Sequence, residues 1–266
     1  MSALSVLFER IFSQVRDRSV PEQFVELNSY TAEATAVARP QSELTGRDLL
    51  APVSVIVARI KTAYGFNDAH FDTHVMEVLQ ELASYLHQLP ATPNSEFSGS
   101  SGALRMALEI GLYSLQAAEG RTFGDNDDVG PASYMKHRWR LASLLGGLFS
   151  ELHRVFGHVQ VFNDNGECWP MECLPLNNWL SETAAKRYSL KWRNTVIDAH
   201  ALTVHIASQI IPHHVIAYLA AGNSVVIPQL FSCIAGGNHP SEKNVINEIV
   251  RRTASAILDR NMRDRA

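Results

Sequence analysis

The stretch SEFSGSSGALRMALEIGL, residues 95–112, joins a Gly/Ser-rich loop to an apolar segment with a helical pattern. Such a loop can bind a phosphate at the helix N-terminus, present metal ligands on the first turn, or simply connect two helices. A phosphate-binding GxxxxGK[ST] loop needs a Lys, and none follows Gly102. A dinucleotide-binding turn needs a preceding strand, which the pattern does not provide. The residues therefore favour a connector between helices.

The helical pattern continues on both sides of this stretch. Gly65 is placed to end a helix, and Asn67 or Asp68 is placed to cap the next one. The first of these helices has its apolar residues on one face, at Leu50, Val53, Val57 and Ile60. Further helices are predicted at residues 67–90, 102–115, 134–156, 176–187, 199–211, 213–221 and 241–259.

The segment HVQVFNDNGECW, residues 158–169, has a different pattern. Apolar residues alternate at Val159 and Val161, a turn follows at residues 163–166, and the chain returns with Cys168 and Trp169. An Asn-Gly pair supplies the positive φ that tight hairpin turns need. The sequence therefore predicts a mainly α protein with one small β-hairpin near residues 159–169.

Composition places the chain among ordinary globular proteins, with 266 residues, 46% hydrophobic and 19% charged, and a net charge of −4. No global positive field draws it to nucleic acid, so any such contact needs a local patch. The three cysteines cannot all pair and none lies in a CxxC motif. We therefore expect reduced thiols, a cytoplasmic location and no membrane span.

Residues 1–43 are expected to form an N-terminal amphipathic helix and a connector. The apolar stretch near the start is interrupted by charges and is too short to span a membrane. Packing of this helix on the body of the protein or on a partner is favoured over contact with a membrane surface. Its apolar residues at helical spacing are Leu4, Leu7, Phe8, Ile11 and Phe12.

Eleven histidines raise the question of a metal site. His70 and His74 share a helix face at i and i+4, but no acidic residue completes an HExxH motif. The remaining close pairs are not spaced to share a helix face: His153 with His158, His200 with His205, and His213 with His214. A structural imidazole, exposed or half-buried, is the favoured interpretation of each pair.

The segment KRYSLKWR, residues 186–193, is the best local basic patch and has aromatic residues interleaved. Such a segment can grip a nucleic-acid backbone and stack bases. A solvated helix end or a strand edge is the alternative interpretation. The candidate DNA contacts are Lys186, Arg187, Tyr188, Lys191, Trp192 and Arg193.

Several segments in a fixed order resemble one family. They are DLLAPVSVIVARIKTAYGFNDAHFDTHVMEVLQELASYLHQLPATPNSE, SGALRMALEIGLYSLQAAEGRTF, RWRLASLLGGLFSELHRV, VQVFNDNGECWP, YSLKWRN and IVRRTASAILDRNM. Together they are similar to the TraI-like, MobH-type conjugative relaxase/helicase domain family, over Leu44 to Met262. The resemblance implies a domain at residues 44–262 with an HD-domain-like helical bundle that serves DNA processing in conjugation.

The resemblance also implies a divalent-metal site built from histidines and an Asp. The metal-ligand motifs of the family are degenerate here, because His200 alone matches an expected ligand and no catalytic residue is evident. Glu96 and Glu151 are carboxylates, whereas Phe97 and Met106 bring apolar bulk. The positions that correspond to the family site are Ser95, Glu96, Phe97, Met106, Ser150, Glu151, His200 and Ala254.

Three hypotheses follow. The first is a catalytically degenerate relaxase-like domain that binds DNA, single-stranded or at a transfer origin, or assembles with other conjugation proteins, with no cofactor. The second is an active metal-dependent phosphodiesterase or nuclease that holds a divalent metal at Glu96, Glu151 and His200. The third is an interaction module that uses the N-terminal helix or the hairpin edge.

Overall fold

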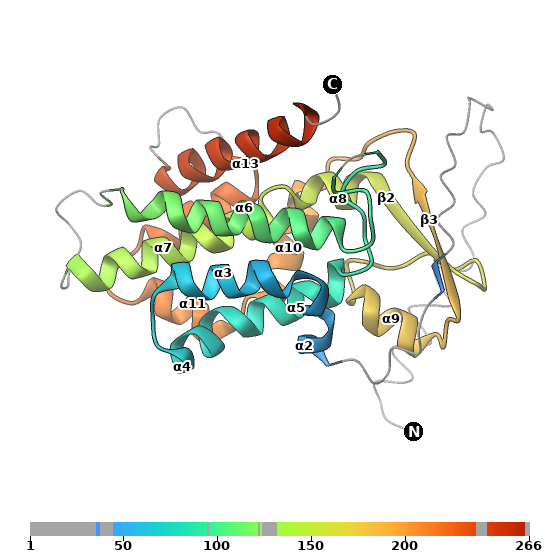
Figure 1. Ribbon diagram of the computed structural model, residues 1–266, viewed down its shortest axis with the longest axis horizontal. Helices are drawn as coiled ribbons and strands as arrows, with labels where there is room; N and C mark the ends of the chain where they lie inside the picture. Colours follow the sequence, from blue (N-terminus) through green and yellow to red (C-terminus); the bar gives the residue numbers. More distant parts are fainter. Residues whose placement is uncertain are drawn as a thin grey trace. The chain divides into compact units, whose positions relative to one another are not determined.

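The computed structural model describes residues 36–37, 45–94, 96–121, 123, 132–237 and 244–263 (Figure 1). The amphipathic helix expected in the first 20 residues and the site position Ser95 lie outside the described residues. The division into residues 1–43 and 44–262 stays a prediction.

The fold is mainly helical with a small β-hairpin, as predicted, and the first strand of that hairpin also joins a three-stranded antiparallel sheet. In the described parts of the chain, no helix has both the length and the apolar character that crossing a membrane requires. The helices are α2 (Gly46–Leu49), α3 (Ser54–Tyr64), α4 (Asp68–Phe71), α5 (Glu77–Leu86), α6 (Gly102–Glu119), α7 (Ala132–Phe149), α8 (Leu152–His158), α9 (Leu176–Glu182), α10 (His200–Ile210), α11 (His213–Ala220), α12 (Val226–Ile234) and α13 (Val245–Arg263), with a 3-10 turn η2 (Ala51–Val53) and a π-helical turn η3 (Asp72–Met76).

The predicted helix signals near residue 65 are confirmed. Gly65 ends α3 with a φ of 73°, a left-handed conformation that glycine adopts without steric cost. The side chain of Asn67 then caps α4 by accepting a hydrogen bond from the backbone N–H of His70 at 2.8 Å. The predicted apolar face of the first helical segment is buried at all four positions.

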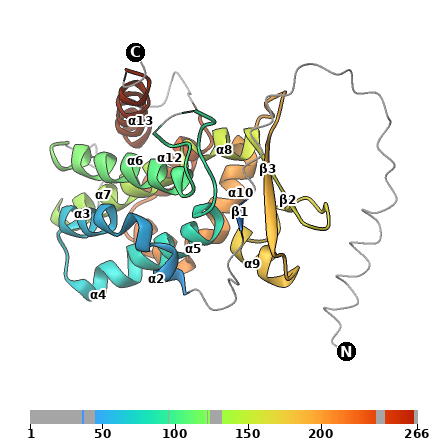
Figure 2. The same ribbon diagram turned by 45° about the vertical axis from the view of Figure 1, so that its right-hand side comes forward.

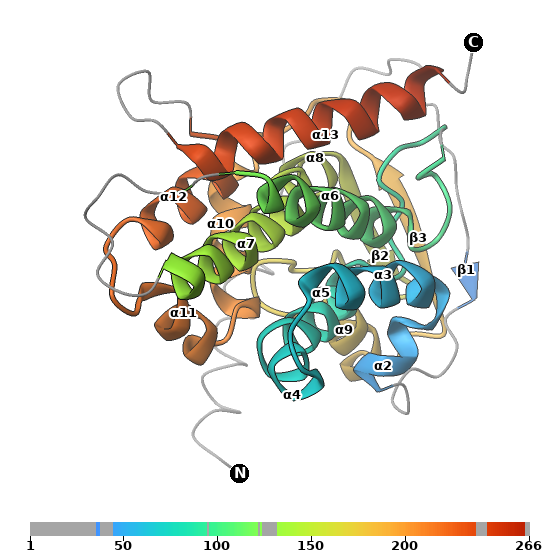
Figure 3. The ribbon, with the colours of Figure 1, turned by 60° about the vertical axis from the view of Figure 1, so that its left-hand side comes forward.

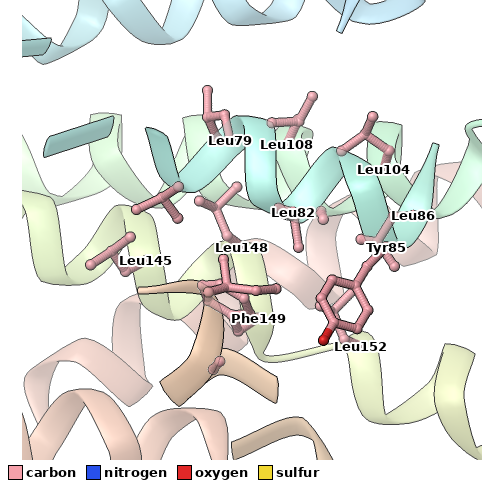
Figure 4. Close-up of a cluster of buried hydrophobic side chains, with 14 of the residues drawn as sticks. Leu79, Leu82, Tyr85, Leu86, Leu104, Leu108, Leu145, Leu148, Phe149 and Leu152 are labelled. Carbon is pink, nitrogen blue, oxygen red and sulfur yellow. The ribbon is translucent and has the colours of Figure 1, made fainter. Parts of the chain in front are cut away.

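The core lies where α5, α6 and α7 meet (Figure 4). Leucines from α5 and α6 face Leu145, Leu148 and Phe149 of α7 in one apolar cluster. The helices α6 and α7 come unusually close, since a Cβ on Gly147 would lie 2.8 Å from the Cα of Gly111. The Gly-Gly pair of α7 is thus a packing requirement of the helix crossing.

The long helix α13 lies across α6 and α7 (Figure 3). The buried carboxylate of Glu109 on α6 binds α13, because it accepts a hydrogen bond from Arg260 of α13 at 2.6 Å. It also accepts a hydrogen bond from Arg105 Nε of α6 at 3.0 Å. A buried carboxylate is stable only when it is paired in this way. Glu109 therefore ties the C-terminal helix to the core.

The sheet lies to one side of the helices, beside α8 and α9 (Figure 2). Strand β3 (Arg187–Trp192) is central, with β1 (Ala36–Val37) and β2 (Val159–Asn163) antiparallel on its two sides. The backbone N–H of Trp169 donates to Val161 O at 2.9 Å, which closes the predicted hairpin. Tyr188 and Leu190 of β3 are buried, while Arg187, Ser189 and Lys191 lie on the opposite face of the strand.

Two predicted helix ranges are wrong, and one helix is missing from the prediction. The helix expected at residues 176–187 ends at Glu182, because Ala184 has a φ of 49° and the alternating burial of β3 follows. The helix expected at residues 134–156 is interrupted at residues 150–151, so α8 can turn away and lead into β2. Helix α12 was not predicted, because Pro228 and the surrounding glycines obscure its pattern, yet a proline is tolerated in a first turn.

Candidate functional site

The loop before α6 is a tight connector. The first amides of α6 are occupied by the chain itself, since Gly102 N donates to Gly99 O at 2.9 Å and Ala103 N donates to Leu89 O at 2.8 Å. A Cβ on Gly102 would overlap the carbonyl of Phe97, whose ring is fully buried. These contacts agree with the predicted connector, because they use two of the N–H groups that a phosphate at this helix end would need.

The family-site positions in and after this loop are not gathered as metal ligands. Glu96 pairs with Arg105 and lies 4.0 Å from the guanidinium of Arg260. Met106 is buried in α6, and Ala254 is buried in α13 with only a methyl group to offer. Glu96 thus belongs to the ion-pair network that joins α6 to α13.

The interruption between α7 and α8 and the start of α10 bring a second set of polar groups together. The imidazoles of His153 and His200 stack with ring centroids 3.9 Å apart and an interplanar angle of 18°. His153 Nδ1 donates to Ser150 O at 2.8 Å, and His200 Nδ1 lies 2.7 Å from the Asp198 carboxylate. We call these two stacked rings the His153–His200 pair.

The surroundings of the His153–His200 pair control its charge. Burial lowers the pKa of His153, and the nearby His200 lowers it further. Hydrogen bonds from the backbone and side chain of His200 lower the pKa of the exposed Asp198 carboxyl. Glu151 forms an ion pair with Arg154 on the same helix turn. These interactions give each charged group of the site a partner within the chain.

Close packing and burial limit the space and the reactivity at this site. A Cβ on Gly236 would lie 2.7 Å from His200 Nε2, so the glycine backbone packs directly against the imidazole. Burial raises the pKa of the Cys233 thiol to about 12, which makes it a structural thiol rather than a nucleophile. The hydroxyl oxygen of Ser150 is buried without a hydrogen-bond partner in the described structure.

The side chains do not fit the divalent metal that the family resemblance implies. Across the part of the chain that the structure describes, no three His, Cys, Asp or Glu side chains are arranged to hold an ion. Glu96, Glu151 and His200 therefore do not form the ligand set of the second hypothesis in this arrangement. His153 was missed as a neighbour of His200, because the two residues lie on different helices and share no sequence spacing.

The basic segment at residues 186–193 divides between the two faces of the sheet. Tyr188 is buried, and burial raises its pKa to about 12, so its ring is not free to stack on a base. Arg187 and Lys191 are exposed on the opposite face, together with the partly buried Ser189. Of the other candidate DNA contacts, Lys186 is exposed, while Trp192 and Arg193 are half-buried.

An aromatic residue of the neighbouring strand completes this face. Phe162 of β2 lies directly opposite Ser189, and Gln160 lies opposite Lys191, so all belong to one side of the sheet. The Lys191 ammonium lies 5.1 Å from the centroid of the Phe162 ring. We call Gln160, Phe162, Arg187, Ser189 and Lys191 the β2–β3 face. Sequence reasoning missed Phe162 because strand pairing brings it to the basic segment.

The sequence model of the TraI_2 family, described as "Putative helicase", matches residues 42–266. The match covers most of the chain, and the chain therefore belongs to this family. A search of curated proteins finds no match.

Proposed function

From this family membership, we propose that the chain is a catalytically degenerate relaxase-like domain that contacts DNA through the β2–β3 face. It acts in DNA processing or assembly for a conjugative or integrative mobile element, on an HD-type helical scaffold. Membership of a family described as "Putative helicase" supports a nucleic-acid substrate. The lack of a three-residue ligand set among the described side chains supports the loss of the metal chemistry.

The observation that carries the proposal is the juxtaposition on the β2–β3 face. Two exposed cations, Arg187 and Lys191, lie on the same side of one strand, and the ring of Phe162 on the neighbouring strand lies beside Lys191. Lys and Arg side chains form ion pairs with the phosphates of a nucleic-acid backbone, and an aromatic ring can stack on any of the bases. The chain as a whole carries a net charge of −4, so binding must depend on this local patch.

Fluorescence anisotropy with a labelled single-stranded oligonucleotide at two salt concentrations tests the proposal. Neutralising Arg187 and Lys191 together removes two phosphate contacts, so we expect the slope of log K against log salt to fall by about 1.4 units. Replacing Phe162 with Ala removes one stacking contact, which is typically worth about 1–3 kcal/mol.

The matched control is the double variant Arg251→Ala/Arg252→Ala. Both arginines are exposed on α13, so the control removes the same charge from a different element. A loss of binding equal to that of the Arg187/Lys191 variant would mean that net charge alone drives the association. No binding by the unaltered protein at low salt would remove DNA contact from the proposal.

A further inference from the structure

A second group of histidines lies within a cluster of aromatic rings that the proposed function does not use. Helix α3 contributes its last residue and the turn after it contributes a ring, and the other members come from the α4–η3 segment, α7 and α11. We call it the ring cluster, and its members are Tyr64, Phe66, His70, His74, His137, His214 and Tyr218.

The centre of the ring cluster is a stack of three nearly parallel rings. Phe66 stacks on His70 with centroids 4.4 Å apart, and His70 stacks on His74 at 4.0 Å with an interplanar angle of 12°. Tyr218 of α11 packs edge-on against both imidazoles, at 5.2 Å from His70 and 4.7 Å from His74. His137 of α7 meets the Phe66 ring at 4.2 Å. The stack is thus the point at which α4–η3 meets α7 and α11.

Hydrogen bonds fix the imidazole orientations in the ring cluster. His74 Nδ1 donates to the carbonyl of His70 at 3.2 Å, and His214 Nε2 of α11 donates to the carbonyl of Thr73 at 3.0 Å. His70 Nδ1 lies 3.0 Å from the Tyr64 hydroxyl. Burial raises the pKa of Tyr64, so the phenol keeps its proton and can donate to a neutral His70. This arrangement suits uncharged imidazoles.

The surrounding charges also favour uncharged imidazoles. Burial lowers the pKa of His70, His74 and His137, and nearby imidazoles lower those of His70 and His74 further. Arg140 lowers the pKa of His137, which Glu119 of α6 opposes. The other charged groups around the cluster are Lys136 and Arg138 of α7 and Glu77 of α5, whose carboxylate lies 3.5 Å from His214 Nε2.

We propose that the ring cluster is a pH-sensitive contact. It holds the α4–η3 segment against α11 at neutral pH and lets this segment separate from α11 in mild acid. Two stacked imidazoles at 4.0 Å repel one another once both are charged, and the apolar neighbours Phe66 and Tyr218 offer no carboxylate to compensate. The π-helical turn η3 carries His74 and lies in the released segment, and such turns are often found at functional positions.

The direction of the pH effect follows from proton linkage. The folded protein lowers the pKa of three histidines below their ordinary value of 6.5, so it binds fewer protons than the opened form. The stabilising effect of the contact is therefore fully present above pH 6.5. It is lost as the pH falls through the lowered pKa values that these histidines have in the folded protein.

Hydrogen exchange of the full chain at pH 7.5 and pH 5.5, corrected for intrinsic exchange rates, tests this proposal. At pH 5.5 we expect the amides of η3 and α11 to lose hydrogen-exchange protection, by about tenfold for each unit by which the histidine pKa in the folded form lies below that in the opened form. Amides of α6 should keep their protection. The variant His70→Phe/His74→Phe keeps two flat rings that cannot be charged, so it should lose most of the acid response and keep only the contribution of His137. The control is His213→Gln, at an exposed position on α11. The protection of this variant should respond to acid as that of the unaltered protein does.

Two results would overturn the proposal. One is equal protection of η3 and α11 at both pH values. The other is an acid response in the double Phe variant as large as that of the unaltered protein. If the variant does not fold, NMR titration of the unaltered protein decides, because ring signals of His70 and His74 that titrate at the ordinary value of 6.5 contradict the mechanism.

Discussion

The two stacked histidine pairs of this protein have nearly the same geometry and opposite surroundings. The rings of His70 and His74 lie 4.0 Å apart at 12°, and those of His153 and His200 lie 3.9 Å apart at 18°. Tyr218 and Phe66 surround the first pair, whereas the Asp198 carboxylate holds the second at 2.7 Å. Burial lowers the pKa of His153 as it lowers those of His70 and His74, so the two pairs differ in their partners: a carboxylate beside His200 and aromatic rings beside the first pair.

The comparison shows why stacking alone does not indicate a role. His137 of the ring cluster lies in the first turns of α7, and His153 follows the last turn of that helix, so one helix links the two regions. The pair without a carboxylate is suited to a change of state with pH. The pair with a carboxylate occupies the position where the family resemblance implies a metal site.

The largest effect is expected from Gly147→Ala, which disturbs α7, the helix that links the two regions. The new Cβ would lie 2.8 Å from Gly111 Cα and 2.9 Å from Ile110 O, so α6 and α7 must separate. Overpacking of this kind costs about 1–3 kcal/mol, measurable as a lower free energy of unfolding in urea. NMR signals of His153 should shift more than those of His70, because Gly147 lies in the last turn of α7.

The control for this variant is Gly120→Ala, at the end of α6. A Cβ there meets nothing within 4 Å and the φ of −88° suits alanine. Its free energy of unfolding should change by less than about 0.5 kcal/mol. An equal loss in both variants would contradict the close crossing of α6 and α7.

A smaller effect is expected from Tyr218→Ala, which removes the edge-on ring from the first pair only. The loss of this half-buried side chain should cost about 1 kcal/mol of unfolding free energy, less than the loss of a fully buried aromatic ring. Signals of His70 and His74 should shift while those of His153 do not. Tyr113→Ala on α6 is the matched control, since Tyr113 is also half-buried and packs beneath Arg59 outside the ring cluster.

The smallest effect is expected from His200→Ala, which removes the side-chain hydrogen bond to Asp198 and keeps the one from the backbone N–H of residue 200. The pKa of the Asp198 carboxyl should rise part of the way toward its ordinary value of 3.8, as measured by NMR titration. His205→Ala on the same helix should leave that pKa unchanged. An unchanged Asp198 pKa in the His200 variant would show that the two side chains do not interact in solution.

Much of the fold could be predicted from local sequence. Gly65 and Asn67 mark a helix end and a helix start through their own backbone preferences, and the Asn-Gly turn marks the hairpin. The candidate sites were less predictable. His153 reaches His200, and Phe162 reaches Lys191, only because separate elements pack together. The sequence predicts only that His70 and His74 are structural imidazoles on one helix face, since spacing does not report what packs against that face.

The sequence by itself determined the helical class, the connector before α6 and membership of the family, because caps, periodicity and the order of motifs depend on neighbouring residues. Tertiary structure decided the surroundings of each histidine and the two faces of β3. Charge on an imidazole depends on burial and on groups within a few ångströms, and these come from elements distant in the chain. The segment at residues 186–193 carries the same eight side chains in either interpretation, but strand pairing buries Tyr188, leaves Arg187 and Lys191 exposed, and brings Phe162 beside Lys191.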